Sequence, residues 1–74
     1  MNEYEAFLMS VGQQLRVARE NAGMSQIALA RAVGTSQGAI SQYENGRYVM
    51  TMWTLTKLCE VLGASADELL GLED

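Results

Sequence analysis

The sequence predicts an all-α protein built from five short helices. Apolar residues recur at helical spacing along almost the whole chain, glycines separate the periodic segments, and hydroxyl-bearing residues stand where helices would begin. No segment shows the alternation of apolar and polar residues that is typical of a strand. Because 74 residues form one small core and leave no room for a second, we expect a single domain over residues 1–74.

The first helix is predicted from an apolar face that repeats every three or four residues. The members of this face are Tyr4, Phe7, Leu8, Val11, Leu15, Ala18 and Ala22. The helix should end near Asn21-Ala22-Gly23, because glycine suits a left-handed cap.

The second helix is expected over residues 26–33. Ser25 is placed to cap its start, and Gly34 suits the left-handed conformation at its end. Ala30 is small at the point where this helix must cross the next one closely. A short helix, a tight turn on glycine and a second short helix is the layout of a helix-turn-helix.

The third helix follows this turn. Thr35 or Ser36 can cap it, and we expect it to run to about Glu44. Asn45-Gly46 then supplies residues that tolerate a positive φ. Ile40 is spaced to pack back against Leu29 and Val33 of the second helix.

Two further helices are expected after residue 50. Thr51 can cap the fourth, and Gly63 should close it. Its inward-facing residues are expected to be Met52, Leu55, Leu58, Cys59 and Leu62. The segment Ser65-Ala66-Asp67-Glu68 is a capping-box pattern, which predicts a short fifth helix through Leu69 and Leu70.

The composition excludes several classes of protein. With Cys59 as the one cysteine and no histidine, the chain has neither an intramolecular disulfide nor a credible zinc site, and we expect Cys59 in the core. No nucleophile has an evident base partner and no glycine-rich phosphate motif is present, so we expect no enzyme activity, no cofactor, no metal and no small-molecule ligand. No run approaches the roughly 18 apolar residues of a membrane span, and the acidic start is unlike a secretory signal, so we expect a cytoplasmic protein.

The formal net charge of −4 argues at first sight against a nucleic-acid partner. The charges are unevenly distributed, however. Acidic residues gather at the two ends, at Glu3, Glu5, Asp67, Glu68, Glu73 and Asp74. The middle of the chain holds five basic residues against three acidic ones, a difference of +2. The acidic ends are most simply a solubility feature.

Two stretches resemble the lambda repressor and Cro-like helix-turn-helix domains. LRVARENAGMSQIALARAVGTSQGAISQYENG is similar to the first three helices of that family, and LTKLCEVLGASADELL to its fourth and fifth. The resemblance runs from about residue 11 to residue 70. It implies a sequence-specific regulator of transcription that binds double-stranded DNA, of a repressor or controller type, with the third helix in the major groove.

The resemblance also implies which residues would contact bases. These positions are Gln37, Gly38, Ser41 and Gln42. A glutamine amide can pair with N6 and N7 of adenine, and serine can bond to several bases. Glycine costs roughly 1 kcal/mol against alanine inside a helix, and close approach to DNA would explain why Gly38 is present. The plainer alternative is an ordinary solvated polar face.

Phosphate contacts are implied for a second set of residues, which would position the protein without recognising sequence. This set comprises Gln26, Ser36, Asn45, Arg47 and Tyr48. In the family a glutamine at the position of Gln26 also supports the recognition helix, and an arginine and a glutamate at the positions of Arg19 and Glu44 pair across the first and third helices.

Members of this family commonly pair on inverted repeats, so we expect a homodimer. Trp53, Leu69 and Leu72 are candidates for its interface. Trp53 lies in the unusually apolar stretch RYVMTMW, and it could either bind a partner or cover the domain's own core. The alternative function is a protein-interaction module, antitoxin-like or adaptor, that keeps the helix-turn-helix only as a scaffold.

Overall fold

The structure is a computed structural model that describes residues 1–72. Its helices are α1 (Glu3–Asn21), α2 (Gln26–Val33), α3 (Gln37–Glu44), α4 (Met52–Leu62) and α5 (Ala66–Leu70). Residues 1–72 contain no strand, so the predicted all-α class and its five helices are confirmed. Glu73 and Asp74, which belong to the acidic C-terminal end of the sequence, lie outside the described residues.

Side-chain caps fix the starts of the helices as the sequence predicted. Ser25, Thr51 and Ser65 each accept a hydrogen bond from the backbone N–H three residues later, and so does Ser36, which caps α3 in place of Thr35. Gly34 ends α2 with a φ of 84°. In the turn directly after α3, Gly46 has a positive φ of 69°, whereas Asn45 has a φ of −92°.

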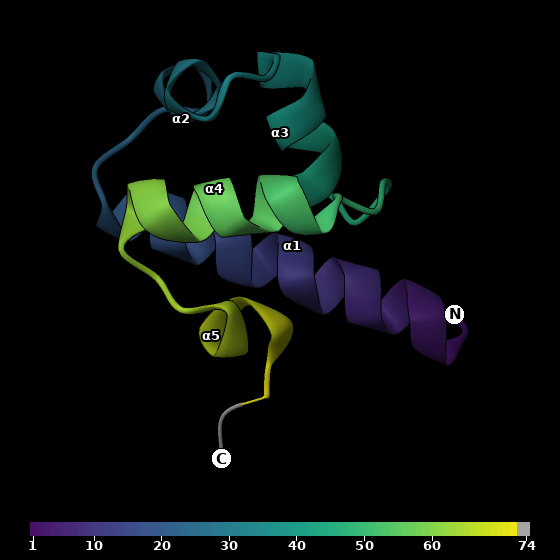
Figure 1. Cartoon of the computed structure of the whole chain (residues 1–74). Helices are drawn as coiled ribbons and strands as arrows, with labels where there is room; N and C mark the ends of the chain where they lie inside the picture. The colour runs from purple at the N-terminus through teal and green to yellow at the C-terminus, as the bar shows by residue number, and fades with distance from the viewer. Residues whose placement is uncertain (73–74) are drawn as a thin grey trace.

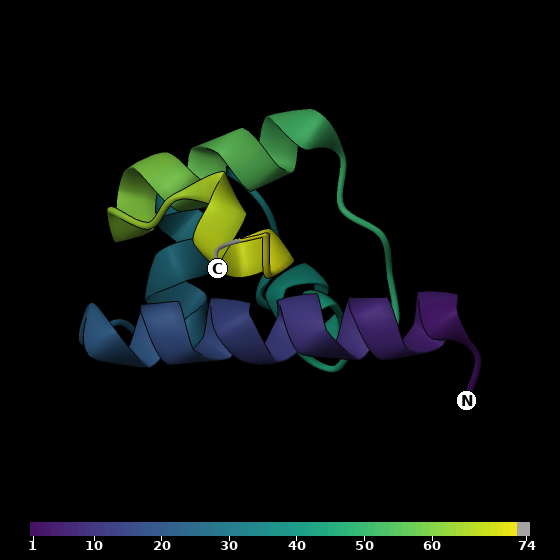
Figure 2. The same cartoon turned by 90° about the horizontal axis from the view of Figure 1, so that it is seen from below.

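The helices are arranged in layers around one core. In Figure 1 α4 lies in front of α1, and Figure 2 shows that these two helices are on opposite sides of the molecule with the other three between them. Five side chains in the core are fully buried: Leu15, Leu29, Ile40, Leu58 and Leu69. The helices α1 to α4 each supply at least one residue to the central cluster, which consists of Leu15, Leu29, Ala30, Ile40 and Leu58. The helix α5 contributes the buried Leu69 outside this cluster. Burial of a leucine or isoleucine of this size contributes about 1.5–3 kcal/mol.

The end of α3 lies directly against α1 at a glycine that the sequence pattern did not single out. A Cβ atom on Gly12 would be 2.5 Å from the carbonyl oxygens of both Tyr43 and Glu44. A second close approach follows at Gly46, where a Cβ atom would be 2.9 Å from Cα of Met9. Any larger residue at position 12 would therefore push apart the two helices that carry Arg19 and Glu44.

Three expectations about inward-facing residues were wrong. Tyr4 and Phe7 are exposed, because the first turns of α1 extend beyond the other helices (Figure 1). Met52 is 86% exposed, since it is the first residue of α4 and no neighbouring helix covers it. Cys59 is half-buried rather than fully in the core, and burial together with nearby Glu68 raises the pKa of its thiol.

We predict that Gly12→Ala lowers the free energy of unfolding by about 1–3 kcal/mol, because its methyl group would meet backbone atoms that cannot move aside independently. Gly38→Ala is the matched control, since a Cβ atom there meets only the Ser36 hydroxyl, at 3.9 Å. It should raise stability by about 0.5–1 kcal/mol through helix propensity. Chemical denaturation of both variants measures the difference, and equal stabilities would contradict the close crossing.

Candidate nucleic-acid interface

Residues of both predicted contact sets meet on one surface, formed by α3 and the loop that follows it. An open hollow of about 410 Å³ lies there. Its lining consists of Ser36, Gly38, Ala39, Gln42, Tyr43, Tyr48 and Val49. The fold thus places Gly38 and Gln42, which are predicted to contact bases, beside Ser36 and Tyr48, which are predicted to contact phosphates.

The orientation of α3 follows from its own sequence. Ile40 and Glu44 are both buried and lie four residues apart, so they define the inner face of the helix. Gly38 and Gln42, also four residues apart, lie on the opposite side of the helix. Gln37 lies on the same side as Ile40, three residues before it, and is exposed at the start of α3.

Gly38 has no packing role inside the protein. It is exposed in the first turn of α3, and an added Cβ atom would meet no atom nearer than the Ser36 hydroxyl. Its φ is not in the positive region. Neither crowding within the protein nor backbone strain requires glycine at position 38. Nothing within the protein therefore explains why the chain accepts the lower helix propensity of glycine there.

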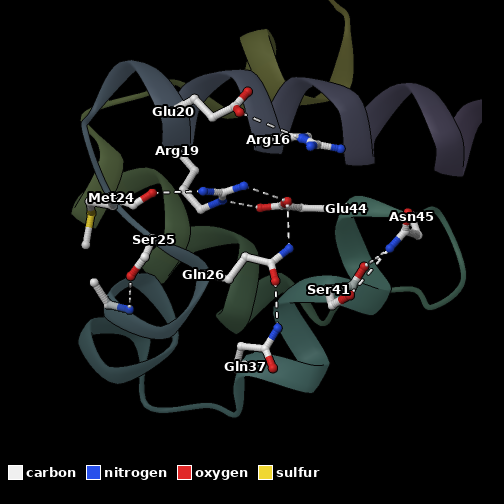
Figure 3. Close-up of polar contacts among 11 residues, drawn as sticks. Arg16, Arg19, Glu20, Met24, Ser25, Gln26, Gln37, Ser41, Glu44 and Asn45 are labelled. Atoms are coloured by element: carbon white, nitrogen blue, oxygen red, sulfur yellow. Dashed lines mark hydrogen bonds and ion pairs between the residues drawn. The ribbon is translucent and has the colours of Figure 1, made fainter.

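Arg19 and Glu44 form a partly buried ion pair between α1 and the end of α3 (Figure 3). Arg19 Nε donates to Glu44 Oε2 at 2.6 Å, and Nη2 donates to Oε1 at 3.1 Å. Arg19 Nη1 donates to the Met24 carbonyl at 2.8 Å, which also ties down the turn before α2. The bond to Glu44, opposed by burial, raises the pKa of Arg19 above its usual value.

Gln26 connects this ion pair to the outer surface. Its Nε2 donates to Glu44 Oε1 at 3.1 Å, and its Oε1 accepts from Gln37 Nε2 at 2.6 Å. Figure 3 shows the resulting chain of contacts from α1 to the first residue of α3. The sequence did not indicate the link from Gln26 to Glu44, because the two residues are 18 positions apart and no local pattern joins them.

Asn45 is held against α3 by its own side chain. Its Nδ2 donates to the Ser41 carbonyl at 2.8 Å and lies 3.4 Å from the Ser41 hydroxyl oxygen. One donor of this phosphate candidate is therefore occupied within the protein.

Few charges oppose an anion at this surface. In the segment from α2 through residue 50 the one acidic residue is Glu44, which is buried against Arg19. Arg31 and Arg47 are exposed and form no ion pair with the described residues, whereas Arg16 lies 3.9 Å from Glu20. The surface is thus weakly basic although the chain as a whole is acidic.

A separate apolar surface lies along α4 and the start of α1. Trp53 is 68% exposed with Lys57 Nζ 4.6 Å from its ring centroid, so the alternative that Trp53 covers the core is wrong. Next to Met52, an apolar hollow of about 100 Å³ is lined in part by Phe7, Val49 and Leu55.

The three interface candidates differ in exposure. Trp53 and Leu72 are exposed, but Leu69 is 1% exposed. Leu69 is therefore wrong as an interface candidate, because α5 turns this side chain inward where the helix packs on α1 and α4.

Two negative findings apply to residues 1–72. None of the helices described there is long and apolar enough to cross a membrane. No group of three or more side chains of the kinds that bind metals lies together within the same residues.

Residues 10–72 match the model of a family described as a helix-turn-helix domain. This match covers most of the chain and includes the turn at Gly34 between α2 and α3. The chain belongs to the lambda repressor and Cro-like helix-turn-helix family. The resemblance found in the sequence is thereby confirmed.

One named relative of this helix-turn-helix protein is a transcriptional regulator. It is 37% identical over 59 residues to the SPbeta prophage-derived uncharacterized HTH-type transcriptional regulator YonR of Bacillus subtilis (strain 168). The match covers 80% of this chain and 55% of YonR, so the chain spans about half the length of that relative.

Solved structures that share the fold include a controller protein and a phage repressor. The restriction-modification controller protein C.AhdI from Aeromonas hydrophila is 31% identical, with a TM-score of 0.82, over 86% of this chain and 97% of C.AhdI. The P22 c2 repressor protein, in complex with synthetic operator 9T, is 33% identical, with a TM-score of 0.80, over 85% of this chain and 96% of the repressor.

We predict that Glu44→Leu lowers the free energy of unfolding by about 3–5 kcal/mol, because it leaves the Arg19 guanidinium without its partner. The double variant Arg19→Met, Glu44→Leu should regain much of this loss, since neither charge remains to be desolvated. Glu60→Leu is the control, as Glu60 forms only an exposed pair with Lys57 and should change stability by less than about 0.5 kcal/mol. Urea denaturation measures all three, and a double variant no more stable than Glu44→Leu would contradict the prediction.

Proposed function

We propose that this protein is a transcriptional regulator of repressor or controller type that binds double-stranded DNA sequence-specifically through α3. The observation that carries the proposal is the exposed side of α3, where Gln42 lies beside Gly38, a glycine that the protein's own packing does not require and that directly follows the exposed Gln37. Membership of the helix-turn-helix family supports it, as do the regulator named YonR, the controller C.AhdI and the operator-bound P22 c2 repressor.

In this proposal α3 enters the major groove, which is about 12 Å wide and admits one helix. Gln37, Ser41 and Gln42 contact base edges, and the open space at Gly38 lets the helix backbone approach the bases or sugars. The hollow beside Gly38 leaves room on the same side.

Phosphate contacts fall to exposed groups around α3. Arg47 and Tyr48 follow the helix on the exposed loop, and Ser36 lies at its start. Gln26 and Asn45 keep this role although each already uses one side-chain donor inside the protein. With Arg47 as the main cation of the set, the binding would involve few ionic contacts.

A homodimer on an inverted repeat is the second part of the proposal. One recognition helix contacts only a few base pairs, and two of them meet half-sites about one DNA turn, 34–36 Å, apart. The apolar surface at Met52 and Trp53, with exposed Leu72, would face the second copy. The same surface favours the competing function, a module that binds a different protein.

Selection of bound sites from random duplex DNA tests the function directly. We predict enrichment of an inverted repeat, and sedimentation at micromolar concentration should show a dimer free or on DNA. If no sequence is enriched at low salt, DNA binding is contradicted and the interaction module replaces it. Enrichment by a strictly monomeric species would reject the dimer alone.

Base contacts and phosphate contacts should respond differently to substitution. We predict that Gln37→Ala or Gln42→Ala costs about 1–3 kcal/mol on the selected site and relaxes preference at particular base pairs. Arg47→Ala should instead weaken binding to all sequences and flatten log K against log salt by roughly one unit per lost contact, or about two in a dimer. Affinities on specific and scrambled duplexes at several salt concentrations distinguish them. If Arg47→Ala alone changed the preferred base sequence, the base-contact and phosphate-contact roles would have been assigned the wrong way round.

We predict that Gly38→Ala weakens DNA binding while it stabilises the free protein, because the added methyl group has room within the protein but would meet DNA. Thermal melts and binding isotherms on this one variant separate the two effects. Unchanged affinity would show that Gly38 does not lie against DNA.

A further inference from the structure

The hydrogen bonds from Arg19 to Gln37 form one chain that can run in only one direction. The chain passes through Glu44 and Gln26, and it ends at a side chain that the proposed function places on a base edge. We propose that Glu44, a buried residue to which the proposed function gives no DNA contact, makes Gln37 select adenine over guanine. This inference rests on the proposed function and adds a positioning residue to it.

The direction follows from the chemistry of the two ends. A guanidinium only donates hydrogen bonds, and a carboxylate only accepts them. Glu44 therefore accepts from Arg19 and also from Gln26, which must turn its NH2 group inward, 3.1 Å from Oε1. The amide oxygen of Gln26 is left to face Gln37, so Gln37 must donate to it, at 2.6 Å.

This direction determines what Gln37 has left to offer. One N–H of its amide is used on Gln26, which leaves the oxygen and the second N–H. In Figure 3 the nitrogen of Gln37 faces Gln26 and its oxygen points away from Gln26. One donor beside one acceptor matches N7 and N6 of adenine in the major groove.

The reversed chain would have the opposite preference. If Gln26 donated to Gln37, the oxygen of Gln37 would be occupied and both of its N–H groups would be free. Two donors match the two acceptors of guanine, N7 and O6. The difference between the two bases thus depends on which way the amide of Gln26 faces, and that is decided by its contact with Glu44.

Burial of Glu44 and Arg19 stabilises the hydrogen-bond direction. The side chain of Glu44 is 3% exposed and that of Arg19 is 11% exposed, so water has little access to replace either partner. Gln26 has only Glu44 as its inner partner among the bonds of this chain. Arg19 holds the carboxylate in position, but the carboxylate itself sets the direction.

Glu44→Gln is the direct test, because the new amide can accept from Arg19 and donate to Gln26, which permits the reversed chain. Gln37→Ala first identifies the base pair concerned, as the position in each selected half-site that loses its preference. There the wild-type protein should prefer adenine over guanine by roughly 5- to 150-fold, the value of one bidentate pair. In Glu44→Gln this ratio should fall by about 5-fold or more.

Two further variants separate the effect of the hydrogen-bond direction on base preference from an effect on the stability of the protein. Arg19→Lys weakens the ion pair but leaves the carboxylate, so it should destabilise the protein and keep the adenine preference. Gln26→Ala leaves the ion pair but cuts the chain, so it should keep most of the stability and lose the preference. Glu60→Gln makes the same chemical change as Glu44→Gln on the exposed face of α4, and it controls for the altered net charge.

Competition binding on the adenine and guanine duplexes, with denaturation of each variant, gives the result. The proposal is overturned if folded Glu44→Gln keeps the wild-type ratio, if Gln26→Ala keeps it, or if Arg19→Lys loses it to the same extent. It is also overturned if the wild-type protein prefers guanine at this position. Should Glu44→Gln fail to fold, Gln26→Ala decides alone. Failure of the wild-type protein to enrich any sequence would instead reject the proposed function itself.

Discussion

The ion pair between Arg19 and Glu44 joins the long helix α1 to the last turn of α3, and the position of α3 depends on it. The guanidinium also binds the Met24 carbonyl, so one side chain fixes both ends of the helix-turn-helix. A buried pair of this kind contributes little net stability, because desolvation offsets the attraction between the charges. Its value is geometric: it has one favourable arrangement, and that arrangement sets the angle at which α3 leaves the core.

Close packing supports the same contact. At Gly12 the backbone of α1 lies against the carbonyl groups at the end of α3, nearer than any side chain would allow. The fully buried Leu29 and Ile40 hold α2 and α3 together from the other side. These three features hold α3 against α1 and α2 from different sides, so its position in the fold is set by contacts with both helices.

The charges of the chain are distributed in keeping with this arrangement. Glu44, the one acidic residue from α2 through residue 50, is buried and paired, so it does not repel an anion at the surface. The other acidic residues lie on α1, α4 and α5 or at the C-terminal end. An acidic protein can thus present a weakly basic face, and specificity would rest on directional hydrogen bonds more than on the number of phosphate contacts.

The sequence by itself determined the helices and their ends. Caps such as Ser25 and Thr51, and the left-handed turn at Gly34, are local interactions within a few residues, so spacing alone reveals them. The inward position of Ile40 could be predicted from its spacing to Leu29 and Val33, and Ile40 is fully buried beside them. The family resemblance added the candidate contact residues, but it could not show how their side chains bond to one another.

Tertiary structure decided what depends on contacts between distant segments. The role of Gly12 exists only because α3 crosses at that point, and the burial of Leu69 only because α5 packs back on α1. Met52 and Trp53 are large apolar residues of the kind found in cores, yet both side chains are largely exposed because the other helices do not cover them. The chain of hydrogen bonds from Arg19 through Gln26 to Gln37 joins three helices. Its direction cannot be predicted from the periodicity of any one helix, because it depends on contacts between helices.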